Sequence, residues 1–206
     1  MSTTASPATS LPVLEEAGRR LLFTEARTAN TFTDQPVTDE QLHAIYELAK
    51  FGPTSANTSP LRILFVRPGE GRDRLLPLMN EGNRAKTATA PVVAVLANDH
   101  AFHERIPELL PFKPELREVF AADDAMRENS ARYNGALQAA YFIFAIRAVG
   151  LAAGPMVGFD ATAFDAEFFA GTTWHSHLVV NIGNPGADAW FGRLPRLDHD
   201  DVVRYA

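Results

Sequence analysis

Apolar residues recur at helical spacing in two segments near the start of the chain, residues 13–24 and residues 38–51. Each spacing predicts a helix with one buried face. The second helix is predicted to begin at Thr38, because the Thr38 hydroxyl and the Gln41 side chain can form a capping box. Gly52-Pro53 is expected to end this helix, since proline cannot continue it.

Short runs of apolar residues, or of alternating apolar and polar residues, predict the strands of a sheet. They cover residues 61–66, 91–97 and 178–182. The run 91–97 is continuously apolar, which is typical of a strand covered by helices on both faces. Residues 133–149 form the most apolar predicted helix. It is shorter than the ~20 residues needed to cross a bilayer, and we expect it to serve both as a core helix and as a dimer interface.

The remaining segments are shorter or irregular. Helices are predicted over residues 72–79, from Thr162 and near Asp198. Residues 80–83 are expected to end the first of these helices, before a short segment with Arg84 and Lys86. Residues 98–124 contain three prolines and no regular pattern. They are therefore either a flap over a site or a packed surface excursion.

Composition limits the protein to a few classes. The chain has 206 residues, of which 46% are hydrophobic and 21% charged, as expected for one globular domain over residues 13–206 after a flexible leader, residues 1–12. A formal net charge of −6 argues against a nucleic-acid surface, and the leader lacks the features of a signal peptide. The absence of cysteine removes thiolate chemistry and fits a cytoplasmic location.

Two histidine pairs were considered as metal ligands. His100 and His103 stand three residues apart beside Glu104, and His175 and His177 would share one face of a strand. Neither pair has a third ligand in the sequence, so we predict no metal site. The chain also lacks a Gly-x-Ser-x-Gly elbow, a dinucleotide-binding fingerprint and a P-loop.

Polar binding groups are instead distributed over several loops. Residues 52–60, Gly-Pro-Thr-Ser-Ala-Asn-Thr-Ser-Pro, hold two prolines and several hydroxyl and amide groups, which fits either a capped turn or a ligand-binding loop. Three arginines lie in loops near the two ends of the chain: Arg27, Arg193 and Arg196. They are either ordinary surface charges or ligands of a phosphate group. Residues 154–158 offer backbone N–H groups, or form a simple connection.

These segments, in this order, resemble the FMN-dependent nitroreductase family from about Arg27 to Val203. The resemblance rests on Arg27-Thr28-x-Asn30-x-Phe32, on Pro53-Thr54-Ser55-x-Asn57-x-Ser59-Pro60, on the stretch from Gly150-Leu151 to Gly158-Phe159, and on Arg193-Leu194-Pro195-Arg196. Within the family, the chain is most similar to the malonic semialdehyde reductase (3-hydroxypropionate dehydrogenase) subfamily of pyrimidine catabolism.

The resemblance implies an α+β fold, a mainly antiparallel sheet wrapped by helices, and an intertwined homodimer with two FMN sites at the subunit interface. It assigns Arg27, Arg193 and Arg196 to the FMN phosphate, together with Thr28, and places Asn30 at the pyrimidine edge of the flavin. It brings Pro53, Thr54, Ser55 and Asn57 in from the partner subunit. It lines one face of the ring with Pro155, Met156, Val157 and Gly158, with the Gly158 N–H near flavin N5.

The implied reaction is a ping-pong hydride transfer from NADH or NADPH to a small-molecule acceptor such as malonic semialdehyde. Arg62, Arg84 and Lys86 are candidates for binding the substrate carboxylate. Most family members carry a cation where Asn30 stands, so the resemblance implies a lower flavin reduction potential in this chain unless Arg84 or Lys86 supplies that charge. A broad nitro or quinone reductase, a non-catalytic flavin-binding redox sensor and a flavin-free helical interaction domain remain as alternatives.

Overall fold

The apolar run after Pro91 forms the middle of the sheet. In the computed structural model, which describes residues 11–206, this run is strand β2 (Val92–Asp99), and all eight of its residues are buried. Side chains alternate between the two faces of a strand, so burial at every position means that both faces are covered. The prediction of a strand between two layers of helices is confirmed.

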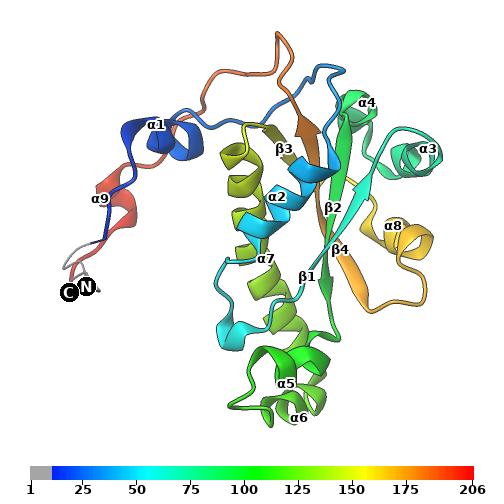
Figure 1. Ribbon diagram of the computed structural model, residues 1–206, viewed down its shortest axis with the longest axis vertical. Coiled ribbons are helices and arrows are strands. Elements are labelled where there is room, and N and C mark those ends of the chain that lie inside the picture. The colour runs from blue at the N-terminus through cyan, green and yellow to red at the C-terminus, as the bar shows by residue number, and fades with distance from the viewer. Residues whose placement is uncertain (1–10) are drawn as a thin grey trace, which may run out of the picture.

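Four antiparallel strands make up the sheet, in the order β1-β2-β4-β3 (Figure 1). Strand β1 (Leu61–Val66) and strand β3 (Ala152–Met156) form the two edges, and β4 (Trp174–Gly183) lies beside β2. Strand β1 has the predicted bounds, whereas β4 extends beyond the predicted run at both ends, and β3 was not predicted as a strand. Pro155 is tolerated in β3 because that strand is at an edge.

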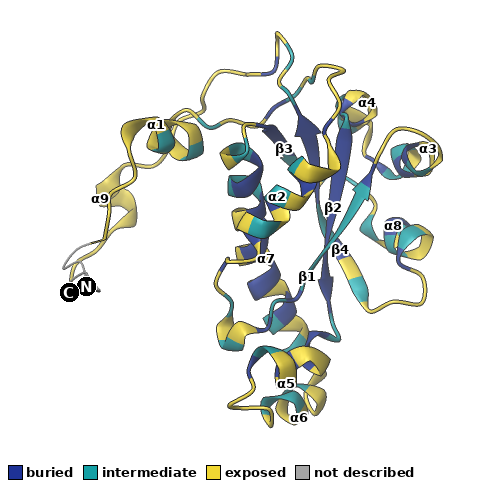
Figure 2. Ribbon diagram, viewed as in Figure 1, coloured by how far each residue is buried: buried dark blue, intermediate teal, exposed yellow. Residues whose placement is uncertain are grey.

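Helices cover the two faces of the sheet as separate layers (Figure 2). On one face, α2 (Asp39–Ala49) and α7 (Asp124–Ala148) share an apolar cluster with β2 and β4. On the other face, a second cluster includes Leu75 of α3 (Glu70–Leu75) and Phe164 of α8 (Ala161–Phe168). The expected α+β fold, with an antiparallel sheet wrapped by helices, is therefore confirmed.

Helix α2 begins with the predicted capping box. The Thr38 hydroxyl accepts a hydrogen bond from the Gln41 N–H at 3.2 Å, and the Gln41 side-chain oxygen accepts from the Thr38 N–H at 3.0 Å. Both N–H groups lie at the helix start, where no intrahelical partner exists. This local signal positions α2, and with it the loop that follows.

Helix α7 has 25 residues and begins at Asp124, nine residues before the predicted start at Tyr133. Asp123 caps this end, since its carboxylate accepts from the Met126 N–H at 2.9 Å. The first two turns are rich in polar residues and therefore lack the apolar spacing by which a helix is predicted. The expected stop at Gly150 is confirmed by a φ of 82° there. Among residues 11–206, no helix is long and apolar enough to span a membrane.

Two further predictions about local structure were right only in part. The helical segment before residue 80 does end, with Met79 and Asn80 in non-helical conformations, but the break is shorter than residues 80–83 because α4 (Glu81–Thr89) begins within them. Residues 98–124 are mostly regular: Asn98 and Asp99 end β2, and short helices follow. These helices are a 3-10 turn (Phe102–Arg105), α5 (Ile106–Leu109) and α6 (Leu116–Ala121). Each is too short to show a helical period in sequence.

Both ends of the described chain form an arm that stands away from the body (Figure 1). It carries α1 (Glu16–Arg19), a π-helical turn (Arg20–Thr24) and α9 (His199–Val202). Helices were predicted in both places, over residues 13–24 and near Asp198. These elements have no buried residue. Residues 1–10 of the predicted leader lie outside the described part. The remaining helical turns cover Ser55–Asn57 and, after α3, Leu76–Leu78.

Gly135 provides a test of how closely α7 packs on the sheet. A Cβ atom at this position would lie 1.7 Å from the Asn98 side-chain oxygen. We expect Gly135→Ala to lower the free energy of unfolding by about 1–3 kcal/mol, as overpacking does. Gly82 in α4 is the control, because a Cβ there meets nothing within 4 Å. Gly82→Ala should raise stability by roughly 0.5–1 kcal/mol. Urea denaturation measures both, and a shift of the same sign would contradict the expected difference in packing.

Candidate functional site

The three predicted phosphate-binding arginines converge on one cavity of about 300 Å³. It lies where the two ends of the chain pass each other. Its lining comes from two segments and consists of Ala26, Arg27, Thr28, Asn30, Phe191, Gly192, Arg193, Leu194 and Arg196. Loops from opposite ends of the sequence therefore bring together five of the predicted cofactor-binding residues.

Backbone carbonyls hold these arginine side chains in place. Arg27 donates to Phe191 O at 3.2 Å, and Arg193 donates to Thr24 O at 2.6 Å and to Ala26 O at 3.1 Å. Arg196 bonds only to carbonyls of its own loop. No carboxylate within residues 11–206 forms a salt bridge with any of the three. The positive charge of the cavity is therefore available for an anion.

A second cavity, also about 300 Å³, shares Ala26 and Arg27 with the first. Arg147, near the end of α7, lines it opposite the arm together with Trp190. Burial lowers the pKa of the Arg147 guanidinium. Glu25 lines the same cavity but pairs with Arg20 at 2.7 Å, and neither Arg27 nor Arg147 forms a salt bridge among residues 11–206.

The end of β3 presents a free backbone donor. Within the described chain no group accepts the Gly158 N–H, whereas Gly158 O accepts from Asn80 N at 3.0 Å and from the Asn83 side chain at 2.9 Å. A Cβ at Gly158 would lie 2.4 Å from the Asn83 amide nitrogen. Val157 is 73% exposed, whereas Met156 is buried. The strand thus ends in an accessible segment that α4 holds from one side.

The predicted polar loop lies apart from the arginine cavity. Its Asn57 and Ser59, together with Arg62, line a different cavity of about 780 Å³ beside the edge strand β1. Pro53 and Ser55 are exposed. The structure therefore does not bring residues 53–57 onto the arginines of the same chain.

The three candidates for a substrate carboxylate differ in how far their charge is engaged. Arg62 forms an ion pair with Asp99 at 2.6 Å and donates to Ser59 O at 3.0 Å. Arg84 donates to Met79 O at 2.9 Å. Half-buried Lys86 forms no salt bridge or side-chain hydrogen bond with residues 11–206. Lys86 thus has no side-chain partner among residues 11–206, whereas Arg84, like the three arginines of the cavity, bonds to carbonyls and to no carboxylate there.

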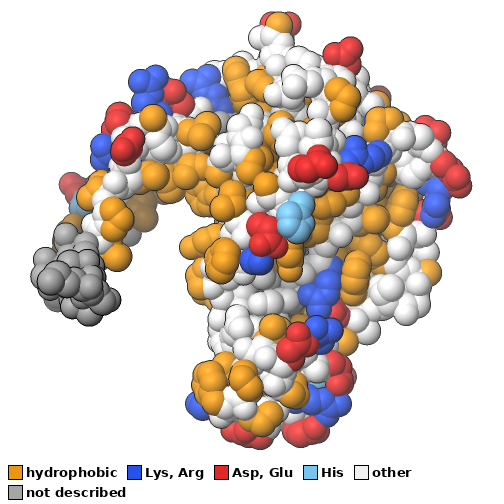
Figure 3. Space-filling view, in the orientation of Figure 1, with side chains coloured by type: hydrophobic (Ala, Val, Ile, Leu, Met, Phe, Trp, Pro, Cys, Tyr) orange, Lys and Arg blue, Asp and Glu red, His pale blue; other side chains and the backbone are white. Residues whose placement is uncertain are grey.

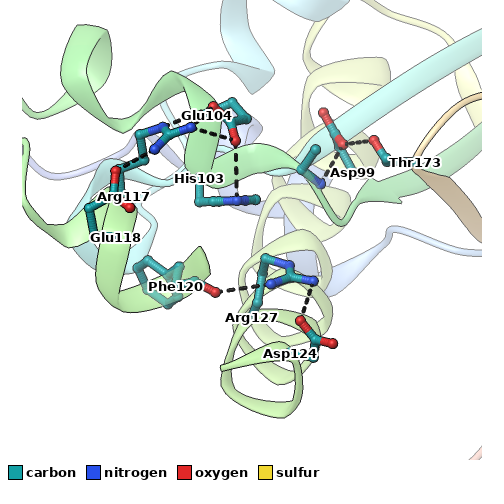
Figure 4. A network of polar contacts seen from close by, with 10 residues as sticks. Asp99, His103, Glu104, Arg117, Glu118, Phe120, Asp124, Arg127 and Thr173 are labelled. Atoms are coloured by element: carbon teal, nitrogen blue, oxygen red, sulfur yellow. Dashed lines mark hydrogen bonds and ion pairs between the residues drawn. The ribbon is translucent and has the colours of Figure 1, made fainter. Parts of the chain in front are cut away.

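Residues 98–124 form a packed unit held by polar contacts (Figure 4). Arg117 binds the carboxylate of Glu104 at 2.9 Å, and Arg127 of α7 donates to Phe120 O at 3.0 Å. Phe102 and Ile106 pack on Ala131 of α7. The segment is packed on α7, and its Arg105, Glu108 and Leu109 also line the cavity of about 780 Å³, so a flap over a site stays a prediction.

The histidines that lie close together in the structure are not the pairs suggested by the sequence. The rings of His100 and His175, one from each predicted pair, lie 4.1 Å apart. Burial lowers the pKa of both His100 and His177, which favours neutral imidazoles. The part of the chain that the structure describes contains no group of three or more metal-binding side chains.

Sequence reasoning missed three amide side chains that support the predicted segments. Asn83 binds Gly158 O, as described above. Asn134 of α7 accepts a hydrogen bond from Ser55 N–H in the polar loop, and Gln138 accepts one from Leu61 N–H, where β1 begins directly after the loop. The available signal was the placement of these two amides one turn apart in an apolar helix, where a buried polar group needs a partner.

Solved structures with the same fold include two nitroreductases. A "putative nitroreductase" of Bacillus subtilis superposes with a TM-score of 0.81 at 20% identity, covering 93% of this chain and all of the other. A "putative nitroreductase in complex with FMN" of Exiguobacterium sibiricum gives a TM-score of 0.79 at 19% identity, covering 96% of this chain and all of the other. At such identities, the likeness establishes the fold.

Sequence comparison identifies nearer relatives. A protein of Streptomyces griseus named "Putative NADH dehydrogenase/NAD(P)H nitroreductase" is 59% identical over 192 residues, 93% of this chain and 97% of the relative. A Leptothrix cholodnii protein of the same name is 54% identical over 179 residues, 87% and 91% of the two chains. Residues 24–184 match the Nitroreductase family. The chain therefore belongs to the nitroreductase family.

Proposed function

We propose that this protein binds FMN in the arginine cavity and uses it to transfer hydride from NADH or NADPH to a small carbonyl acceptor, malonic semialdehyde or a related aldehyde. Membership of the nitroreductase family makes the chain a flavin-dependent NAD(P)H oxidoreductase. The observation that carries the cofactor assignment is the convergence of Arg27, Arg193 and Arg196 without a carboxylate. Bound FMN would supply the hydride chemistry, and the protein would supply orientation and charge.

Residues of this chain fit the two ends of FMN, its phosphate and its flavin ring. The forked guanidinium groups match a phosphate, and Thr28 and Asn30 lie beside them in the same cavity. The Gly158 N–H, which has no acceptor among residues 11–206, is a donor suited to a flavin ring nitrogen, and the missing Cβ leaves room for the Asn83 side chain to pack against this peptide. Asn83 fixes the peptide that follows this donor.

Lys86 is our proposed replacement for the cation that most family members carry at the position of Asn30. Lys86 follows Asn83 by three residues in α4, which places both side chains on neighbouring parts of one helical face. A positive charge near the flavin pyrimidine would stabilise its reduced anion. The same ammonium group is a candidate partner for a substrate carboxylate.

A second copy of the chain completes the proposed site. Tyr133, Leu137 and Tyr141 form an exposed apolar row along α7, each at least 37% exposed, and the arm carries exposed Leu21 and Phe23. Apolar side chains gather where arm and body face each other (Figure 3). Such a surface is typical of a protein interface. In a homodimer, residues 53–57 of one protomer would reach the flavin of the other.

The cofactor is tested by the absorbance of the purified protein and the acceptor by steady-state rates. We expect flavin absorbance near ~450 nm that NADH or NADPH bleaches. A colourless protein that takes up no added FMN would contradict the cofactor assignment, and a flavin that neither nucleotide bleaches would favour the redox sensor. A preference for a nitroaromatic or quinone over malonic semialdehyde by several orders of magnitude would establish the broad reductase instead.

A further inference from the structure

The polar loop has a strained backbone. Ala56, Asn57 and Ser59 have positive φ angles of 53°, 51° and 42°. The left-handed conformation is unfavourable for residues other than glycine, so three such residues in four positions must be held by the surrounding structure. Asparagine tolerates this conformation better than alanine or serine does. Helix α7 supplies part of this support.

Two buried amides of α7 bind the loop on either side of the strained residues. The Asn134 oxygen accepts from the Ser55 N–H at 2.7 Å, and the Gln138 oxygen accepts from the Leu61 N–H at 2.9 Å. The two side chains belong to residues only 1% and 5% exposed. Their spacing of four residues puts them on one face of the helix, one turn apart.

Asn134 is itself held in position. Its amide nitrogen donates to Ser130 O at 2.9 Å and to the Ser130 hydroxyl at 3.2 Å, so its oxygen is turned toward the loop. The middle of the loop is bound from the opposite side, where the Asn57 amide donates to Leu109 O of α5 at 2.8 Å. The backbone of the loop is therefore fixed from α7 and from the packed unit of residues 98–124.

These hydrogen bonds from α7 and α5 leave the outward-facing groups of the loop free. The Ser55 hydroxyl forms no hydrogen bond with the described residues, and Pro53 is exposed. The exposed apolar row of α7 begins with Tyr133 and Leu137, the immediate neighbours of the two amides. One helix thus carries both the proposed subunit interface and the groups that set the shape of the loop beside it.

We propose that Asn134 and Gln138 are positioning residues, which hold residues 53–59 in the conformation that the flavin site of a second copy requires. This role rests on the proposed function. It accounts for two amides buried on one face of α7, since they accept from the Ser55 N–H and the Leu61 N–H at the two ends of the strained loop. It also gives a loop with no regular structure a rigid support.

The test compares four variants of the full chain. Asn134→Leu and Gln138→Met remove the acceptor with little change in size, Gln138→Glu keeps an acceptor oxygen, and Ile146→Val is the control, a small loss of packing in the core of the same helix away from the loop. Hydrogen exchange of residues 52–61 is measured with and without added FMN. The dissociation constant for FMN is measured by fluorescence titration.

We expect Asn134→Leu and Gln138→Met to speed exchange of the loop amides and weaken FMN binding by about tenfold, the effect of one hydrogen bond to a buried acceptor. Ile146→Val should stay within about twofold of wild type, and Gln138→Glu, which keeps an acceptor oxygen but buries a carboxyl group, should lose less FMN affinity than Gln138→Met. If the loop amides exchange at the wild-type rate in Asn134→Leu, the Asn134 side chain does not hold the loop, and the proposal is wrong. Faster exchange with unchanged FMN affinity, or an equal loss of affinity in Ile146→Val, would overturn the positioning role. A wild-type protein that binds no FMN would overturn the proposed function and this role with it, while exchange would still report whether the amides hold the loop.

Discussion

Arg27→Ala should weaken FMN binding by about 1.5–3 kcal/mol, the range for a hydrogen bond to a charged group. Each 1.4 kcal/mol is a factor of about ten, so the dissociation constant should rise roughly 10- to 150-fold. The reason is geometric: Arg27 lines the cavity with Arg193 and Arg196 and has no carboxylate to neutralise it among residues 11–206. Fluorescence titration of the flavin-free protein measures the change.

Arg19→Ala is the matched control for this prediction. Arg19 lies on the same arm, but its guanidinium pairs with Glu16 at 2.8 Å and is exposed. The substitution removes the same formal charge and should leave FMN affinity within about twofold. Equal losses in both variants would mean that net charge, not a phosphate grip, determines binding. Unchanged affinity in Arg27→Ala would show that the phosphate lies elsewhere.

Local patterns predicted the elements that depend on neighbouring residues. The capping box of Thr38 and Gln41 lies within four residues, and the apolar run of β2 records burial on both faces directly. The start of α7 was missed because its first two turns are rich in polar residues and pack on residues 98–124, which is tertiary information, although the Asp123 cap is a local signal. Strand β3 was missed because Gly154-Pro155 opposes strand propensity, whereas pairing with β4 imposes the strand.

The candidate site was predictable in kind but not in arrangement. The sequence contains three arginines in loops at opposite ends, and only the fold brings them to one cavity. The engagement of Arg62 by Asp99 depends on the pairing of β1 with β2, which no spacing reveals. The site assignments themselves stay predictions until flavin binding is measured.

The buried guanidinium of Arg72 links strand β1 to the helix that carries Asn83. Arg72 is 3% exposed, and it donates to Val66 O at 3.0 Å, to Thr87 O at 2.6 Å and to Ala90 O at 2.9 Å. The last two carbonyls lie at the end of α4, where a helix presents unpaired acceptors and negative potential. Burial lowers the pKa of the Arg72 guanidinium, and the carbonyls compensate for part of its lost hydration, since no carboxylate pairs with it and its Nε has no partner among residues 11–206.

Arg72→Ala should therefore lower the free energy of unfolding by about 3–5 kcal/mol, because it leaves three buried carbonyls without donors and opens a cavity. Arg72→Lys should lose less, since an ammonium group keeps the charge but cannot reach all three acceptors. Arg74→Ala on the same helix is the control: Arg74 pairs with Glu167 at the surface, where an ion pair contributes at most about 1 kcal/mol. Urea denaturation gives the three values. A loss in Arg72→Ala no larger than that in Arg74→Ala would mean that the buried guanidinium merely balances its own desolvation, and that packing alone holds α4 against the sheet.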